Sequence, residues 1–164
     1  MIVVSDTTPL ISLMKIGHLE LVYELFGEIQ IPDAVYNELV SSNRFVQEKH
    51  QIQGSSFIRK VIVEDVKAVQ LLRRSTGLDA GESEAIILSD AVGADLLLMD
   101  EVKGRRVAKQ MGIGLMGTIG MLMVAYEEEK LSKGEILECV DILRNNGRHI
   151  SDKLYEQLLQ KLGG

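Results

Sequence analysis

Short apolar runs alternate along this chain with segments that have the spacing of amphipathic helices. Each run is rich in Val, Ile or Leu and has the length of a strand, and together they lie at 2–4, 29–32, 57–63, 95–99 and 113–116. Strands separated by helices of this length form βαβ units, in which helices cover both faces of a parallel sheet. The pattern therefore predicts an α/β protein.

Capping residues and glycines mark the predicted helix boundaries. The sequence Thr7-Thr8-Pro9 is typical of a helix start, and Asp33 is placed to cap the helix after Pro32. Gly77 and Gly93 close two later helices. The last fifty residues are predicted to be nearly all helical, with breaks near 132, 147 and 151. The polar segment 41–56 fits a helix or a loop equally well.

The size and charge of the chain limit its architecture and its partners. Its 164 residues suit one domain without a linker, and a single cysteine permits no intramolecular disulfide. The net charge of −6 argues against tight, metal-free and non-specific binding of nucleic acid. No apolar stretch approaches the roughly 20 residues of a membrane span. We expect a cytoplasmic protein without a membrane partner.

Acidic residues follow two of the predicted strands. Asp6 comes directly after the first strand, and Asp100 comes directly after the strand at 95–99. In open α/β sheets, ligands bind beyond the carboxyl ends of the strands. Either carboxylate could instead cap the helix that follows it. Glu38 flanks the apolar stripe of the helix that starts at Asp33, where a solvated glutamate is the commonest explanation.

Two glutamates occupy the start of a helix that is apolar on nearly all sides. Glu82 has the capping-box spacing to Asp79, whereas Glu84 stands at the end of the apolar stripe. Their side chains point about 160° apart around the helix, so one ion is not expected to bind both. Carboxylates without neighbouring His or Cys are the ligands of hard cations, and Mg²⁺ or Mn²⁺ would suit such a site.

The order of these motifs resembles the PIN-domain family, in particular small prokaryotic members related to the toxin ribonucleases of toxin–antitoxin pairs. The resemblance runs from residue 1 to about 125 and leaves 126–164 as a helical extension. It is carried by the segments Asp6-Thr7-Thr8-Pro9-Leu10-Ile11, Val35-Tyr36-Asn37-Glu38-Leu39, Gly81-Glu82-Ser83-Glu84-Ala85-Ile86 and Leu97-Leu98-Met99-Asp100.

The resemblance implies a three-layer α/β/α sandwich and a metal-dependent endoribonuclease. By position, Asp6, Glu38 and Asp100 match the first, second and last acids of the family, and Glu82 matches the third better than Glu84 does. Thr8 matches a hydroxyl that supports the first acid. An RNA substrate, an antitoxin protein and a homodimer are the partners that the family implies. The alternative is a non-catalytic PIN-like module that binds RNA or protein.

Basic residues and glycines near Asp100 allow further interpretations. Lys103, Arg105 and Arg106, with Lys109 nearby, either contact a phosphate backbone or form a solvated helix face. The segment 112–117 matches the pattern of a dinucleotide-binding loop, but it follows a helix and contains a predicted strand. We therefore interpret that match as fortuitous.

Overall fold

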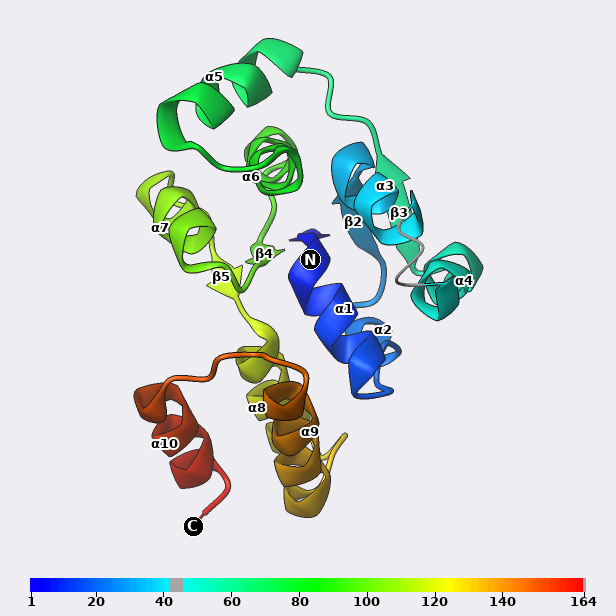
Figure 1. Ribbon diagram of the computed structural model, residues 1–164, viewed down its shortest axis with the longest axis vertical. Coiled ribbons are helices and arrows are strands. Elements are labelled where there is room, and N and C mark those ends of the chain that lie inside the picture. The colour runs from blue at the N-terminus through cyan, green and yellow to red at the C-terminus, as the bar shows by residue number, and fades with distance from the viewer. Residues whose placement is uncertain (42–45, 164) are drawn as a thin grey trace.

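A five-stranded, all-parallel sheet forms the centre of the computed structural model, which describes residues 1–41 and 46–163 (Figure 1). The strand order is β3-β2-β1-β4-β5. The strands are β1 (Val3–Ser5), β2 (Ile29–Pro32), β3 (Ile58–Val61), β4 (Leu96–Leu98) and β5 (Leu115–Met116). The predicted α/β sandwich with a parallel sheet is confirmed.

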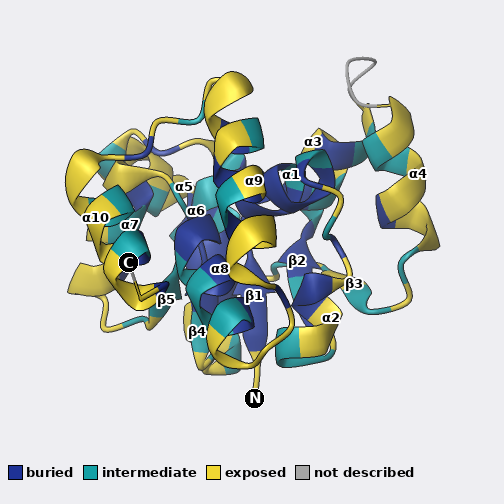
Figure 2. Cartoon of the chain, turned by 90° about the horizontal axis from the view of Figure 1, so that it is seen from below, coloured by how far each residue is buried: buried dark blue, intermediate teal, exposed yellow. Residues whose placement is uncertain are grey.

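Helices occupy most of the remaining described chain and lie on both faces of the sheet (Figures 1 and 2). They are α1 (Thr7–Lys15), α2 (Leu21–Phe26), α3 (Asp33–Ser41), α4 (Val46–Gly54), α5 (Val66–Thr76), α6 (Ala80–Val92), α7 (Val102–Gln110), α8 (Thr118–Glu127), α9 (Lys133–Asn145) and α10 (Asp152–Lys161). The segment 41–56, for which helix and loop were equally open, contains α4. Residues 42–45 of that segment lie outside the described part.

Three strands are shorter than their apolar patterns predict: β3, β4, for which 95–99 was predicted, and β5, for which 113–116 was predicted. The apolar run covers 57–63, whereas β3 pairs with β2 only from Ile58 to Val61. The register ends where Val61 faces Pro32, because Asp33, the next residue that would face β3, is already in α3. Pairing with a four-residue neighbour therefore limits the length of this edge strand.

The alternation of side chains along the strands divides the core between the two faces of the sheet. Val3 and Leu98 belong to one cluster of buried residues, whereas Val4 and Leu97 belong to the other. The second cluster also contains buried residues of α6 and α7. Each face is therefore closed by helices, as the three-layer arrangement requires.

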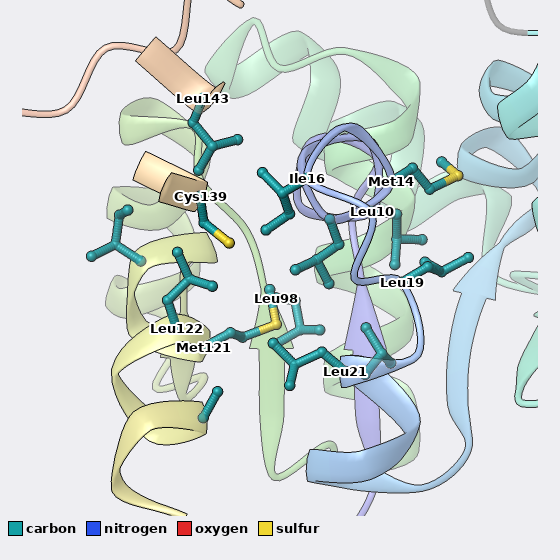
Figure 3. Close-up of a cluster of buried hydrophobic side chains, with 14 of the residues drawn as sticks. Leu10, Met14, Ile16, Leu19, Leu21, Leu98, Met121, Leu122, Cys139 and Leu143 are labelled. Carbon is teal, nitrogen blue, oxygen red and sulfur yellow. The ribbon is translucent and has the colours of Figure 1, made fainter. Parts of the chain in front are cut away.

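The C-terminal helices belong to the same core as the N-terminal half of the chain. Figure 3 shows side chains of α1, α8 and α9 pointing toward one another, among them Leu10, Leu122 and Cys139. Met121 of α8 is completely buried in this cluster. The helical extension thus packs against α1 and α8, within the same core. Within the described residues, none of the helices has both the length and the apolarity to cross a membrane.

Two glycines of the segment 112–117 allow β5 to approach β4 and its neighbours. A Cβ on Gly114 would lie 2.7 Å from the backbone oxygen of Asp95, and the Gly114 carbonyl accepts the Leu97 N–H. A Cβ on Gly117 would lie 2.8 Å from a carboxylate oxygen of Asp100. Close backbone approach therefore accounts for these glycines without a dinucleotide.

We expect Gly114→Ala to destabilise the protein by about 1–3 kcal/mol, because the added methyl group meets backbone that cannot rotate away. Gly134→Ala is the matched control: it lies in helix α9 with only Ser132 Oγ 4.0 Å from the added Cβ, and alanine favours a helix. The control is expected to be stabilising by about 0.5–1 kcal/mol. Urea denaturation of both variants measures this, and equal effects would contradict the explanation.

Candidate active site

Asp6 begins the site because it stands between β1 and α1. Its N–H donates to the carbonyl of Leu98 on β4 at 2.9 Å, which continues the strand pairing by one residue. Asp6 occupies the N-cap position of α1, yet its side chain makes no capping hydrogen bond. The residue is only 3% exposed, and Oδ1 is buried without a hydrogen-bond partner. Helix capping therefore does not explain this carboxylate.

A cavity of about 150 Å³ opens beside Asp6 and is lined mainly by carboxylates. It lies at the carboxyl ends of the strands, where the N-termini of α1 and α6 meet α3. Its lining residues are Asp6, Thr7, Thr8, Glu38, Gly77, Leu78, Asp79, Glu82, Glu101 and Lys103. Five carboxylates and one ammonium group thus share a small space, which we call the carboxylate cavity.

Glu38 reaches the cavity from α3 and is held there by a neighbour of Asp6. The Thr7 hydroxyl donates to Glu38 Oε2 at 2.8 Å. A Cβ on Gly81 would lie 3.2 Å from the same oxygen, so glycine at this position lets α6 pass close to Glu38. The sequence had indicated Thr8 as the supporting hydroxyl. Thr8 lines the cavity, and its predicted support of Asp6 stays a prediction, whereas the Thr7 hydroxyl is the one that holds Glu38.

Glu82 is both part of a helix cap and part of the cavity. Its N–H donates to Asp79 Oδ1, and its Oε1 accepts the Asp79 N–H, so the capping box expected from the sequence is present. The other oxygen, Oε2, is buried without a hydrogen-bond partner. Burial raises the pKa of Glu82 above its usual value, and the charge of Asp79 adds to this. The Glu82 carboxylate therefore uses one oxygen in the helix cap, and its other oxygen stays without a hydrogen-bond partner.

Glu84 lies on a different side of α6, as its position around the helix predicts. Its Oε1 accepts the backbone N–H of Ala34 at 3.2 Å, in the first turn of α3. Glu84 is not among the residues that line the carboxylate cavity. The structure thus brings Glu82, and not Glu84, to Asp6 and Glu38.

Asp100 is engaged by the start of α8. Its Oδ1 accepts the backbone N–H of Thr118 at 2.7 Å, and its Oδ2 accepts the Thr118 hydroxyl at 2.6 Å. It lines a second cavity, which adjoins α8, instead of the carboxylate cavity. The N-cap position of α7 belongs to Glu101, which does line the carboxylate cavity. The role of Asp100 as a metal ligand stays a prediction.

The three basic residues considered for phosphate contact have three different environments. Lys103 lines the carboxylate cavity, and its Nζ lies 2.9 Å from where a Cβ on Gly77 would be. Arg105 donates to the Met99 carbonyl at 2.8 Å and lines the second cavity. Arg106 is exposed on α7 and lines neither cavity.

Sequence reasoning missed three residues that contribute to the carboxylate cavity. Thr7, Asp79 and Glu101 each adjoin or cap a predicted acidic residue, and Asp79 had been considered only as a helix start. The sequence held a signal for Glu101, because two adjacent acids, Asp100 and Glu101, follow the strand. Adjacent side chains of an extended chain point to opposite sides, so either of the two could be the one that faces the cavity.

The electrostatics of the carboxylate cavity favour a cation. The pKa of Asp6 is raised from 3.8 to about 7. Burial is the main cause, the charges of Glu82, Asp79 and Glu38 add to it, and the backbone N–H of Thr7 opposes it. Two buried oxygens, Asp6 Oδ1 and Glu82 Oε2, have no hydrogen-bond partner. An added positive charge would relieve this repulsion and satisfy both oxygens.

The donor set fits a hard divalent ion that keeps part of its water shell. Within residues 1–41 and 46–163, no group of three or more His, Cys, Asp or Glu side chains is arranged to enclose an ion. Mg²⁺ is commonly held by one or two carboxylates, with waters and substrate phosphates as the remaining ligands. The all-oxygen surroundings of Asp6 and Glu82 meet this requirement without a closed cage.

Comparison with protein families gives one result for the whole chain. The sequence matches a family model, DUF3368, described as a PIN domain, over residues 2–164. The match extends through α8, α9 and α10 to the last residue. Among curated proteins, the search finds no match.

The raised pKa of Asp6 predicts how stability depends on pH in metal-free protein. Between about pH 4 and 7 the folded state retains a proton that the unfolded state has lost, so unfolding becomes easier as pH rises through this range. Asp6→Asn removes this dependence. We expect the variant to gain roughly 2–4 kcal/mol over wild type between pH 4 and pH 8.

Chemical denaturation in EDTA at both pH values measures this difference. Asp90→Asn, at an exposed position of α6, controls for the loss of one negative charge. If the difference in free energy of unfolding between Asp6→Asn and wild type is the same at pH 4 and pH 8, the predicted environment of Asp6 is wrong.

Proposed function

Since the chain belongs to the PIN-domain family, whose members are usually nucleases and typically use divalent metal ions, we propose that it is an Mg²⁺- or Mn²⁺-dependent endoribonuclease. The observation that carries this proposal is the pair of buried, unpaired oxygens of Asp6 and Glu82 in a cavity that Glu38 also lines. The proposed reaction is hydrolysis of an RNA phosphodiester bond at this cavity.

In this proposal Asp6 and Glu82 would hold the metal ion through their unpaired oxygens, and Glu38 adds its negative charge to the same cavity. A bound ion would supply positive charge for the phosphate and would lower the pKa of a water molecule at the site. Thr7 keeps the Glu38 carboxylate directed into the cavity through its 2.8 Å hydrogen bond. The second oxygen of Glu82 is held by the Asp79 N–H, which fixes the orientation of the unpaired one.

Lys103 and Asp100 have secondary roles in the proposed site. Lys103 is the cation at the rim of the carboxylate cavity, and we assign it to contact with the phosphodiester. Both oxygens of Asp100 accept hydrogen bonds from Thr118, so Asp100 would act mainly by positioning the end of β4. Arg106 is exposed on α7 and lines neither cavity, so its contact with a phosphate stays a prediction.

The direct test is cleavage of diverse RNAs in the presence of Mg²⁺ or Mn²⁺. We expect Asp6→Asn, Glu38→Gln and Glu82→Gln to lower the rate by at least about 100-fold, since each removes a negative charge from the carboxylate cavity. Glu84→Gln is the matched control on the same helix and is expected to keep wild-type activity. Equal rates for wild type and Asp6→Asn would exclude this site. Failure of wild type to cleave any RNA would favour a binding module without catalysis.

Metal binding has a consequence that does not depend on activity. At 100 times its dissociation constant, an ion that binds only the folded state stabilises it by about 2.7 kcal/mol. We therefore expect Mn²⁺ to raise the melting temperature of wild type by roughly 5–10 °C relative to EDTA. Asp6→Asn and Glu82→Gln should lose most of this rise, whereas Glu84→Gln should keep it. An equal rise in all four proteins would place the ion elsewhere.

The resemblance to toxin ribonucleases suggests a cellular role for the proposed activity, as the toxin of a toxin–antitoxin pair. An RNA substrate implies a cytoplasmic enzyme, and the family suggests a homodimer and an antitoxin protein that restrains it. A toxin would arrest growth when expressed alone, and the arrest would disappear with Asp6→Asn. If active wild-type enzyme did not affect growth, the ribonuclease proposal would stand and the toxin role would be excluded.

A further inference from the structure

A second cavity lies directly beside the carboxylate cavity and has no part in the site described so far. Its volume is about 530 Å³, which is within the usual range for small-molecule sites. It is bounded by α7, β5 and α8 on one side and by the connection 146–151 and α10 on the other (Figure 1). Asp100 lines this cavity, whereas the next residue, Glu101, lines the carboxylate cavity. The two cavities are therefore separated by the chain that joins β4 to α7.

The charge of the second cavity is opposite to that of its neighbour. Arg105 and Arg148 line it together with a single carboxylate, Asp100, whose oxygens are already engaged by Thr118. His149 adds a further donor. An excess of cationic groups in a chain with a net charge of −6 favours an anionic ligand. Arginine forms two parallel hydrogen bonds to a phosphate group, which makes phosphate a suitable anion.

The remaining walls suit a flat, largely apolar group with polar edges. Met116, Ile119, Met123 and Leu154 contribute apolar surface, and methionine side chains adapt to different shapes. Arginine planes also stack on unpaired bases of single-stranded RNA. A nucleobase has both the apolar faces and the polar edges that these walls require.

Ser12 gives an independent indication that a polar ligand group enters this cavity. The residue lines the cavity, is only 1% exposed, and its hydroxyl has no hydrogen-bond partner in the structure. Buried hydroxyl groups are almost always hydrogen-bonded, because an unpaired one loses its interaction with water without compensation. A base edge in the cavity would supply the missing partner.

From these observations we infer that the second cavity binds one nucleotide, with its phosphate at Arg148 and its base between the methionine and leucine side chains near Ser12. Resting on the proposed function, the inference assigns this site to the nucleotide of an RNA strand next to the phosphodiester in the carboxylate cavity. The cavity would thereby select which bases stand beside the bond that is cut.

Titration of isotopically labelled full-length protein with nucleoside monophosphates, followed by NMR in EDTA, tests the binding without any cleavage. We expect AMP, GMP, CMP or UMP to shift the amide signals of Gly117, Gly120 and Ile150, and to bind at least about tenfold more tightly than the nucleoside or inorganic phosphate alone. Arg148→Gln should weaken this binding about tenfold or more. Lys153→Gln, an exposed charge loss on α10 outside the cavity, is the matched control and should bind as wild type does.

Ser12→Ala keeps the inference testable if Arg148→Gln perturbs the fold. It removes an unpaired buried hydroxyl, so we expect unchanged or higher stability together with several-fold weaker nucleotide binding. Unaltered binding in both Ser12→Ala and Arg148→Gln, or inorganic phosphate binding as tightly as the monophosphates, would overturn the inference.

A second arm uses short oligoribonucleotides with the Asp6→Asn variant, in which cleavage is prevented. RNA should shift the same signals, and Arg148→Gln in this background should weaken RNA binding about tenfold. If the cavity binds free monophosphates but not oligoribonucleotides, the assignment to RNA is overturned. Binding of apolar peptides in place of nucleotides would overturn it as well. If wild type cleaves no RNA although nucleotides bind, the inference on the cavity holds and the proposed nuclease fails.

Discussion

Parallel pairing of β1 with a strand on each side is the constraint on which the site depends. Val3–Ser5 pair with β2 and with β4, and all three strands run in the same direction. Their carboxyl ends therefore meet at one edge, and the N–H of Asp6 extends the pairing to Leu98. Because β1 is central and only three residues long, the next side chain is buried at that edge. The polar residue at this position is consequently held out of water beside the starts of α1, α3 and α6.

Burial of one carboxylate determines much of the chemistry around it. Asp6 and Glu82 each keep a buried oxygen unpaired, while Thr7 and the Asp79 N–H hold the neighbouring acids in place. The proposed cation would relieve the repulsion among these groups. On the other side of the β4–α7 connection the balance reverses, because Arg105 and Arg148 outnumber Asp100. The proposed ion thus lies in an acidic cavity, and the proposed nucleotide lies in an adjacent cavity with an excess of basic residues.

Much of the fold could be predicted from local patterns. The apolar runs became strands, the capping signal at Asp79 became a capping box, and the helix break predicted near 132 coincides with the N-cap of α9. The length of β3 could not be predicted from its own residues, since the start of α3 directly after the neighbouring strand ends the pairing. Helix geometry also separated Glu82 from Glu84 correctly, because the angle between two positions on a helix does not depend on what surrounds it.

The sequence by itself determined the order of strands and helices, the helix starts and the presence of acids at strand ends, because these follow from residue type and spacing within a few neighbours. Only the tertiary structure decided which acids share a cavity. Asp100 was directed toward α8 by Thr118, eighteen positions away, and Glu101 was directed toward Asp6 and Glu82. Such choices depend on hydrogen bonds and packing between distant segments, and nothing in the local pattern of a strand end specifies to which side its side chain turns.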